Sequence, residues 1–298
     1  MMAPRDLFVF YDLSLMNKRI VKAFRLAATF SLSFTEKTVE ILVSSRRSDL
    51  SIFRVSTNKD GSITIDAKVD IFSKDFIQIQ NLDDWEDWTF LFAKLCEIYW
   101  SKETKLDNIT INYTEWAPRN APLVKIKAAL EVLRNVTGVN PECETVHFFY
   151  PSHIMLREGS FLHILKIKNE LRISTFPKKC PNNLLCVPRV HFLRSGSETV
   201  EQIMLIQSDE CTFYGSHLTD KDFNTILRGW MDGEDTRNFR LTIHTDVPPN
   251  LDKLEESLKV RDRDTSTKNQ IQFTLVREDG NKASVQRNSL KFIFKFFS

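Results

Sequence analysis

The feature that most constrains the fold is a short pattern of one apolar, one polar and one apolar residue that recurs along the chain. Alternation with a period of two is typical of a β-strand that has one buried face. Successive copies lie about 20 to 40 positions apart, with helical or loop sequence between them, and this is the length of one unit in many repeat proteins. The six copies are Ile109-Thr110-Ile111, Val146-His147-Phe148, Leu171-Arg172-Ile173, Val190-His191-Phe192, Cys211-Thr212-Phe213 and Leu241-Thr242-Ile243.

The pattern predicts a chain of the α+β or α/β class, built as an irregular, leucine-rich-repeat-like stack of strands and helices. The regular leucine spacing and the asparagine ladder of true leucine-rich repeats are missing, so an ordinary α+β domain with short strands is the alternative. Alternating apolar residues at 271–275 and 283–285, with a turn at Asp279 and Gly280 between them, and a final strand at 292–296 predict three antiparallel strands. We expect this C-terminal hairpin region to close the open end of the stack.

One helix is predicted from sequence signals at both of its ends. Thr219 is a good N-cap, Asp222 occupies the capping-box position, and Gly233 follows the apolar stripe, which predicts a helix over 219–232. Further segments with helical spacing lie at 6–25, at 85–99, and from Pro122 to Leu133 with Gly138 as its end, and a short helix is expected around 251–258. A small antiparallel sheet is expected over 39–65, and the charged stretch at 261–268 is interpreted as an exposed loop.

Charge and hydropathy exclude several classes of protein. The net charge is +2, from 41 basic and 39 acidic side chains, which gives no field that would favour nucleic acid as a partner. No apolar run is long enough to span a bilayer, and the apolar stretch near the start contains Asp6 and Asp12 and lacks a cleavage site, which is a poor signal peptide. We therefore expect an intracellular protein, cytoplasmic or nuclear, without a membrane partner.

The motifs of common enzymes and metal sites do not occur. The chain has only 8 Gly and carries no phosphate-binding loop, no Gly-x-Ser-x-Gly and no His-Glu-x-x-His. Cys180, Cys186 and His191 match no common zinc spacing, and the histidines at 147 and 191 are explained more simply by packing in a strand. We therefore expect no catalytic residue, cofactor or metal. The five cysteines are expected to be buried or half-buried thiols: Cys96, Cys143, Cys180, Cys186 and Cys211.

The stretch from Met204 to Asp209, and then 218–224, Leu227 and 230–233, resembles the core of the F-box-associated domain, type 2, of the nematode F-box proteins of the F-box B-like family. The stretch at 276–283 resembles the closing hairpin of that domain, and 292–294 its last strand. The residues that match the family motif, which are expected to be mostly structural, are Ser208, Thr219, Asp222, Asn224, Leu227, Trp230, Gly233, Asp279 and Gly280.

The segment 12–22 is similar to the second half of an F-box, whereas the first half, a Leu-Pro start and the helix after it, is absent. The resemblance implies two parts: a partial, helical F-box-like segment over 1–33 and an F-box-associated, substrate-binding domain over 34–298. It also implies that the adaptor subunit of an SCF ubiquitin ligase docks on Leu13, Leu15, Met16, Ile20 and Val21.

The resemblance implies a protein-interaction module without enzymatic activity, the substrate receptor of an SCF-type ubiquitin ligase, that binds an unknown protein target. Two alternatives stay open. One is a target-binding domain that recruits no ligase because its F-box is incomplete, and the other is an unrecognised enzyme. Trp116, which lies in an expected loop before Pro118, is the tryptophan best placed to anchor a partner.

Overall fold

The structure is a computed structural model of the 298-residue chain. It describes residues 29–35, 37–44, 50–57, 62–68, 77–82, 89, 92–93, 96, 104–112, 121–149, 165–174, 186–194, 196, 198–233, 240–247, 249–250, 253–254, 258, 260–267, 270–288 and 291–297. The chain divides into two compact units. Residues 1–150 and 159–168 form the first unit, and residues 151–158 and 169–298 form the second.

The first unit is an open mixed sheet in which an antiparallel meander continues into parallel strands. β1 lies inside this sheet, because it pairs antiparallel with β2 and parallel with β6. The order across the sheet is β7-β6-β1-β2-β3-β4-β5. The elements are β1 (Thr29–Phe34), β2 (Thr38–Ser44), β3 (Leu50–Thr57), β4 (Ile63–Lys68), β5 (Ile77–Leu82), β6 (Lys105–Asn112), α4 (Ala121–Thr137) and β7 (Glu142–Phe149).

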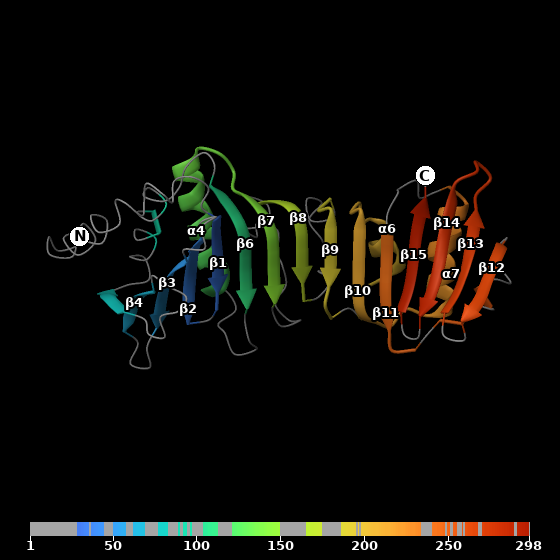
Figure 1. Cartoon of the computed structure of the whole chain (residues 1–298), viewed down its shortest axis with the longest axis horizontal. Coiled ribbons are helices and arrows are strands. Elements are labelled where there is room, and N and C mark those ends of the chain that lie inside the picture. Colours follow the sequence, from blue (N-terminus) through green and yellow to red (C-terminus); the bar gives the residue numbers. More distant parts are fainter. Residues whose placement is uncertain are drawn as a thin grey trace. The chain divides into compact units, whose positions relative to one another are not determined.

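The second unit is also an open mixed sheet, and it contains parallel strands in chain order followed by antiparallel ones (Figure 1). β8 begins in the first unit and ends in the second. β9, β10 and β11 follow it in parallel, with α6 and α7 in the connections, and β15 then pairs antiparallel with β11. The elements are β8 (Lys166–Ile173), β9 (Arg189–Phe192), α6 (Val200–Met204), β10 (Glu210–Ser216), α7 (Asp220–Met231), β11 (Arg240–Thr245), β12 (Val260–Thr267), β13 (Gln270–Val276), β14 (Lys282–Asn288) and β15 (Lys291–Phe297).

The core of the second unit lies between its sheet and α7. Phe192 and Phe213 stack at 4.8 Å between ring centroids on neighbouring strands, β9 and β10. From α7, Phe223 packs 4.5 Å from Phe292 of β15, and Trp230 meets Phe294 edge to face at 5.9 Å. These aromatic side chains are almost fully buried, and α6 and α7 lie behind the strands in Figure 1. One face of the sheet is therefore committed to the core.

The six apolar-polar-apolar triplets all lie in strands, which confirms this part of the prediction. The α+β class is also confirmed. The C-terminal strands are antiparallel as predicted, but they extend the open sheet beyond β11 and leave β12 at its edge, so the expected closure of the end is not confirmed. The leucine-rich-repeat-like comparison remains a prediction. α4 ends where expected, because the Gly138 N–H donates to the Arg134 carbonyl at 2.8 Å and its φ of 72° suits glycine.

Two predictions are wrong. The charged stretch at 261–268 is not a loop: β12 covers 260–267 and pairs antiparallel with β13. Charged residues are common on an edge strand because they discourage pairing with another chain, so charge alone did not indicate a loop. Cys186 is exposed, whereas Cys96, Cys143 and Cys211 are buried as expected.

The boundary proposed at residues 33 and 34 falls inside β1, and the last residues of the expected helical segment, from Thr29 onward, are strand. Residues 1–28 lie outside the described residues, so the helical F-box-like segment remains a prediction. Among the helices that the structure describes, none combines the length and the apolar character needed to cross a membrane.

Candidate interaction surface

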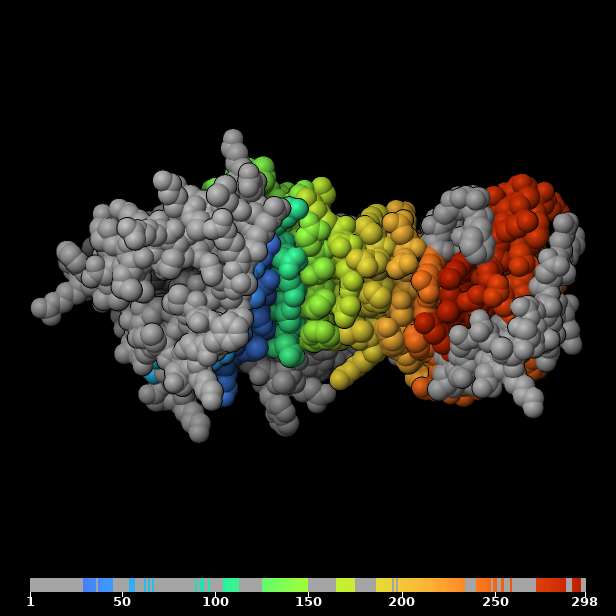
Figure 2. All heavy atoms as spheres, viewed as in Figure 1, coloured from blue at the N-terminus to red at the C-terminus, as the bar shows by residue number. Residues whose placement is uncertain are grey.

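The candidate site is the face of the second unit's sheet that points away from α7. Side chains alternate along a strand, so the residues between the buried ones form this second face. In Figure 2 the strands β9 to β11 present this face to the viewer. We call it the open face, because it points away from the helices, and define it by the side chains of Glu170, Arg172, Arg189, His191, Glu210, Thr212, Tyr214, Arg240, Thr242, His244, Ser284, Ile293 and Lys295. Four of these residues are buried: Glu170, Thr242, Ser284 and Ile293.

A row of charged residues crosses the open face from strand to strand. Glu170 is the register partner of Arg189, Arg189 of Glu210, Glu210 of Arg240, and Arg240 of Lys295. Neighbouring strands lie about 4.8 Å apart, so each side chain in the row has the next one within reach. The first four charges alternate in sign and the fifth repeats the sign of the fourth, which leaves the row most positive at β11 and β15.

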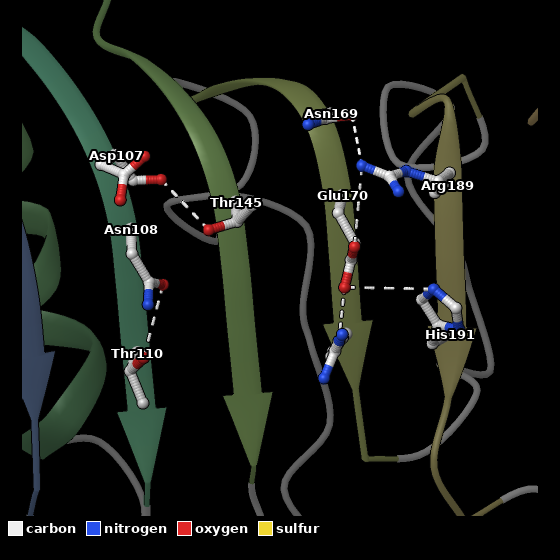
Figure 3. A network of polar contacts seen from close by, with 9 residues as sticks. Asp107, Asn108, Thr110, Thr145, Asn169, Glu170, Arg189 and His191 are labelled. Atoms are coloured by element: carbon white, nitrogen blue, oxygen red, sulfur yellow. Dashed lines mark hydrogen bonds and ion pairs between the residues drawn. The ribbon is translucent and has the colours of Figure 1, made fainter.

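Glu170 is the centre of a polar cluster on this face (Figure 3). Arg172 Nε donates a short hydrogen bond to Oε1 of Glu170, and His191 Nε2 lies 4.0 Å from the same oxygen. Arg189 Nη2 lies 3.9 Å from the other carboxylate oxygen and donates to Asn169 Oδ1 at 2.7 Å. The Glu170 side chain is only 11% exposed, whereas Arg172 and Arg189 are 46% and 40% exposed. One buried carboxylate therefore orients three basic side chains that reach solvent.

The electrostatics of this cluster follow from its geometry. Burial by itself would raise the pKa of Glu170, but the hydrogen bond from Arg172 and the charges of Arg172, His191 and Arg189 lower that pKa below its ordinary value. Burial lowers the pKa of His191, although Glu170 opposes this shift. At neutral pH, Glu170 is therefore a carboxylate and His191 is largely a neutral imidazole that can both donate and accept hydrogen bonds.

The next strands continue the open face with one ion pair and one aromatic pair. Arg240 Nη1 lies 3.8 Å from Glu210 Oε1. Tyr214 and His244 stack at 4.5 Å between centroids, and the Tyr214 side chain is exposed. Burial, and then the charge of Lys291, lowers the pKa of His244. Arginine and tyrosine are enriched where proteins bind each other, so this composition suits a protein partner.

In the first unit, the parallel strands β6 and β7 carry fewer polar contacts between side chains among the described residues. Thr145 Oγ1 donates to the Asp107 carbonyl at 3.1 Å, and Thr110 Oγ1 donates to Asn108 Oδ1 at 3.4 Å (Figure 3). A cavity of about 660 Å³ lies at the C-terminal end of α4, with Val139 exposed at its edge. Ion pairs at its rim are exposed to solvent, so this region is a weaker candidate for recognition.

The family-motif residues of α7 build structure and do not line the open face. Thr219 and Asp222 form the predicted capping box, in which the Asp222 carboxylate accepts from the Thr219 N–H at 2.8 Å. The Thr219 hydroxyl and N–H, which bond the carboxylate, lower the pKa of Asp222. Leu227 and Trp230 are buried, and Asn224 Oδ1 accepts from Arg228 Nε at 3.1 Å.

The remaining motif residues lie in turns and connections. Ser208 is buried between α6 and β10. Gly233 follows α7 with a φ of 80°, a conformation that favours glycine. Asp279 and Gly280 form the predicted hairpin turn between β13 and β14, where Arg277 Nε donates to the carboxylate at 2.8 Å and holds the pKa of Asp279 at about 2.

A buried group of hydrogen bonds around Glu198 was not predicted from the sequence. The Glu198 carboxylate accepts from the Ser216 hydroxyl and from the Gly196 N–H, each at 2.5 Å, and thereby joins the segment before α6 to the end of β10. A Cβ at Gly196 would lie 2.8 Å from the His217 ring. The scarcity of glycine could have drawn attention to Gly196, but no local signal connects Glu198 with Ser216.

The five predicted adaptor-binding residues, from Leu13 to Val21, lie outside the described residues, as do Trp116 and Cys180. Among the residues that the structure describes, no three His, Cys, Asp or Glu side chains gather into a possible metal site. Of the triplet centres that the sequence singled out, Arg172, His191, Thr212 and Thr242 all lie on the open face. Four other residues of this face were not predicted, although each directly precedes a triplet and therefore points to the same face as the centre of that triplet: Glu170, Arg189, Glu210 and Arg240.

The second unit thus defines a class of protein: an open α+β sheet with helices on one face and a polar, charged face on the other. Residues 175–243 match the model of the F-box associated family. The matched segment contains β9, α6, β10, α7 and most of β11, the elements that carry the centre of the open face. No curated protein and no solved structure matches the chain.

Proposed function

We propose that the chain is a protein-interaction module that binds a protein target on the open face of its second unit. The observation that carries this proposal is the F-box associated match over 175–243, because the matched strands supply Arg189, His191, Glu210 and Arg240. This family match favours a substrate-binding role, and we propose that the charged row is the surface that binds the substrate. No residue has to make or break a bond, so the proposal is that of a receptor and not of an enzyme.

The open face suits this role because its polar groups are held in place before a partner arrives. Glu170 fixes Arg172 and Arg189, so less side-chain entropy is lost when these two guanidinium groups bind an acceptor. The exposed ring of Tyr214 adds an apolar contact beside the charges. As part of the same proposal, each strand-helix pair from β9 to β11 acts as one unit of a leucine-rich-repeat-like stack that widens the binding surface.

We further propose that the chain is the substrate receptor of an intracellular SCF-type ubiquitin ligase of the nematode F-box type. In this proposal, residues before position 34 dock on the adaptor subunit through Leu13, Leu15, Met16, Ile20 and Val21. Residues 34–298 hold the target. Two simultaneous binding events raise the effective concentration of the target beside the ligase, which accelerates transfer without any catalysis by this chain.

The ligase link is tested by the retention of the adaptor subunit on the purified protein. The full chain is compared with a variant that lacks residues 1–28, and the deletion stops before Thr29 because β1 pairs with both β2 and β6. Retention by the full chain alone supports the receptor. Retention by neither protein refutes the ligase link and favours the alternative, a target-binding module that recruits no ligase.

The use of the open face is tested separately with two charge reversals. Arg189→Glu reverses the second charge of the row, between Glu170 and Glu210, whereas Lys221→Glu makes the same change at an exposed position of α7, away from the open face. Proteins captured by the full chain are compared by quantitative mass spectrometry. Targets lost with Arg189→Glu but kept with Lys221→Glu support the proposal, and equal loss with both variants contradicts it.

A further inference from the structure

One end of the charged row carries two adjacent cations. Arg240 of β11 and Lys295 of β15 are register partners on the open face, and the next position in the row, on β14, is Ser284. Each neighbouring pair in this set is separated by one strand spacing, about 4.8 Å. We call Arg240, Lys295 and Ser284 the donor set, because their side chains carry N–H and O–H donors.

Two members of the donor set hold buried polar atoms without a hydrogen-bond partner among the described residues. They are Nε of Arg240 and the hydroxyl oxygen of Ser284. Ser284 is only 4% exposed, so its hydroxyl cannot be satisfied by bulk water. Buried groups of this kind normally have a partner, because an unpaired donor loses the free energy of its hydration without compensation. Unpaired donors beside two positive charges have the chemistry that binds an anion.

The local charge selects among possible anions. Glu210 is the acidic neighbour of Arg240 in the row, at 3.8 Å, and it leaves the group of Glu210, Arg240 and Lys295 with a net charge of +1. A carboxylate balances this charge, whereas a doubly charged phosphate exceeds it. Lys295 lies between the two unpaired groups, and its long, flexible side chain can move to admit a ligand.

We propose that the donor set binds a carboxylate, supplied by an acidic side chain of the protein target. This inference rests on the proposed function, since it names the chemistry of the partner at one end of the open face. Arg240 and Lys295 donate charge-assisted hydrogen bonds to the carboxylate, and Ser284 donates through the hydroxyl that is unpaired in the unbound protein. The target is therefore expected to present an acidic segment to β11, β15 and β14.

The test is a fluorescence-anisotropy titration of the full chain with three labelled peptides. One alternates glutamate with serine, the second has glutamine in place of glutamate, and the third has phosphoserine and glutamine. We expect the glutamate peptide to bind best, and we expect Arg240→Gln and Lys295→Gln each to weaken it about tenfold, the effect of one charge-assisted hydrogen bond. Lys221→Gln is the control and should leave the affinity unchanged.

Ser284→Ala separates a binding role from a structural one. Because it removes an unpaired buried hydroxyl, this variant should melt no lower than the original protein, yet it should bind the glutamate peptide more weakly. A lower Tm with unchanged peptide affinity would overturn the role of Ser284. Equal binding of the glutamate and glutamine peptides, equal weakening by Lys221→Gln, or preference for the phosphoserine peptide would each overturn the carboxylate site.

The outcome is distinguishable from a failure of the proposed function. If captured targets are indifferent to Arg189→Glu while the peptide titration discriminates as expected, the carboxylate site stands and target binding through Arg189 does not. If targets depend on Arg189 but the peptides are not discriminated, the proposed function stands and the donor set does not bind a carboxylate.

Discussion

Glu170→Gln tests whether the buried carboxylate of the open face organises the basic side chains around it. The substitution keeps the size of the side chain and an acceptor oxygen for Arg172, but it removes the charge that faces Arg172, Arg189 and His191. The hydrogen bond from Arg172 then joins a cation to a neutral amide instead of a cation to an anion, and this loss of attraction costs about 1 kcal/mol. The two charged guanidinium groups, Arg172 and Arg189, then face one another without a carboxylate. Because both arginines are partly exposed, solvent limits this repulsion, and we expect a total loss of about 1–2 kcal/mol in the free energy of unfolding.

Glu142→Gln is the matched control. Glu142 also pairs with two basic side chains, Lys166 and Lys168, but its own side chain is 39% exposed and the lysines are 68% and 44% exposed. We expect this variant to lose less than about 0.5 kcal/mol. Hydrogen exchange measured by mass spectrometry reports the opening free energy of peptides from β9 and β7 separately. The effect of each substitution is therefore measured in the unit that contains the substituted residue. A loss for Glu170→Gln that is no larger than the loss for Glu142→Gln would refute the argument from burial.

The same cluster predicts the direction of a pH dependence. The pKa of Glu170 is lower in the folded protein than in the unfolded chain, so its stabilisation is present above the unfolded pKa, about 4.3, and is lost as the pH falls through the folded pKa. The difference in stability between the original protein and Glu170→Gln should therefore shrink below pH 4. Since Glu170 opposes the lowering of the His191 pKa, Glu170→Gln should lower that pKa further, which an NMR titration of the imidazole detects. An unchanged or higher pKa would contradict the assigned contact.

Three further predictions follow from local geometry. Thr219→Ala removes the N-cap of α7 and should cost about 1 kcal/mol of stability by denaturant titration, while Thr219→Ser should cost little; equal losses would argue against capping. Gly280→Ala should cost about 1 kcal/mol because φ is 88° and no atom blocks a Cβ, and Gly280→Asn should cost less; a neutral Gly280→Ala would show that the turn adapts. Iodoacetamide should modify the exposed Cys186 in the native protein and spare Cys143, whose pKa burial raises to about 12; modification of Cys143 at a similar rate would contradict its burial.

The strands of the second unit could be predicted from the sequence because their signal is local. An apolar-polar-apolar triplet requires only that one face of a strand be buried, and each of the four triplets from Leu171 to Ile243 lies in a strand. The capping box of α7 was predictable for the same reason, since Thr219 and Asp222 lie three residues apart. The helix begins at Asp220, directly after the predicted N-cap.

The candidate surface could be predicted only in part, because it depends on register. The sequence indicates that Arg189, Glu210 and Arg240 are each next to a strand core, but it does not indicate that they are opposite one another across β9, β10 and β11. That alignment is fixed by the packing of each strand against the helices behind the sheet, and a slip of one residue would move every charge to the other face. The charged residues of β12 misled the prediction for a different reason. The pairing of β12 with β13 is a local hairpin, with Thr267 opposite Gln270, but the charge of the segment was interpreted as the mark of a loop.

The position of β15 has a consequence for how the protein is made. β15 lies between β11 and β14, so the last strand that the structure describes fills a place inside the sheet. While a ribosome is still synthesising residues 291–297, β11 has no antiparallel neighbour and the hairpin of β13 and β14 has nothing to dock against. Such unpaired edges attract other chains, and folding that waits for distant partners is slow. A frameshift or early stop before residue 291 would therefore leave two open edges at once, and we expect it to yield an aggregating chain and not a shortened receptor.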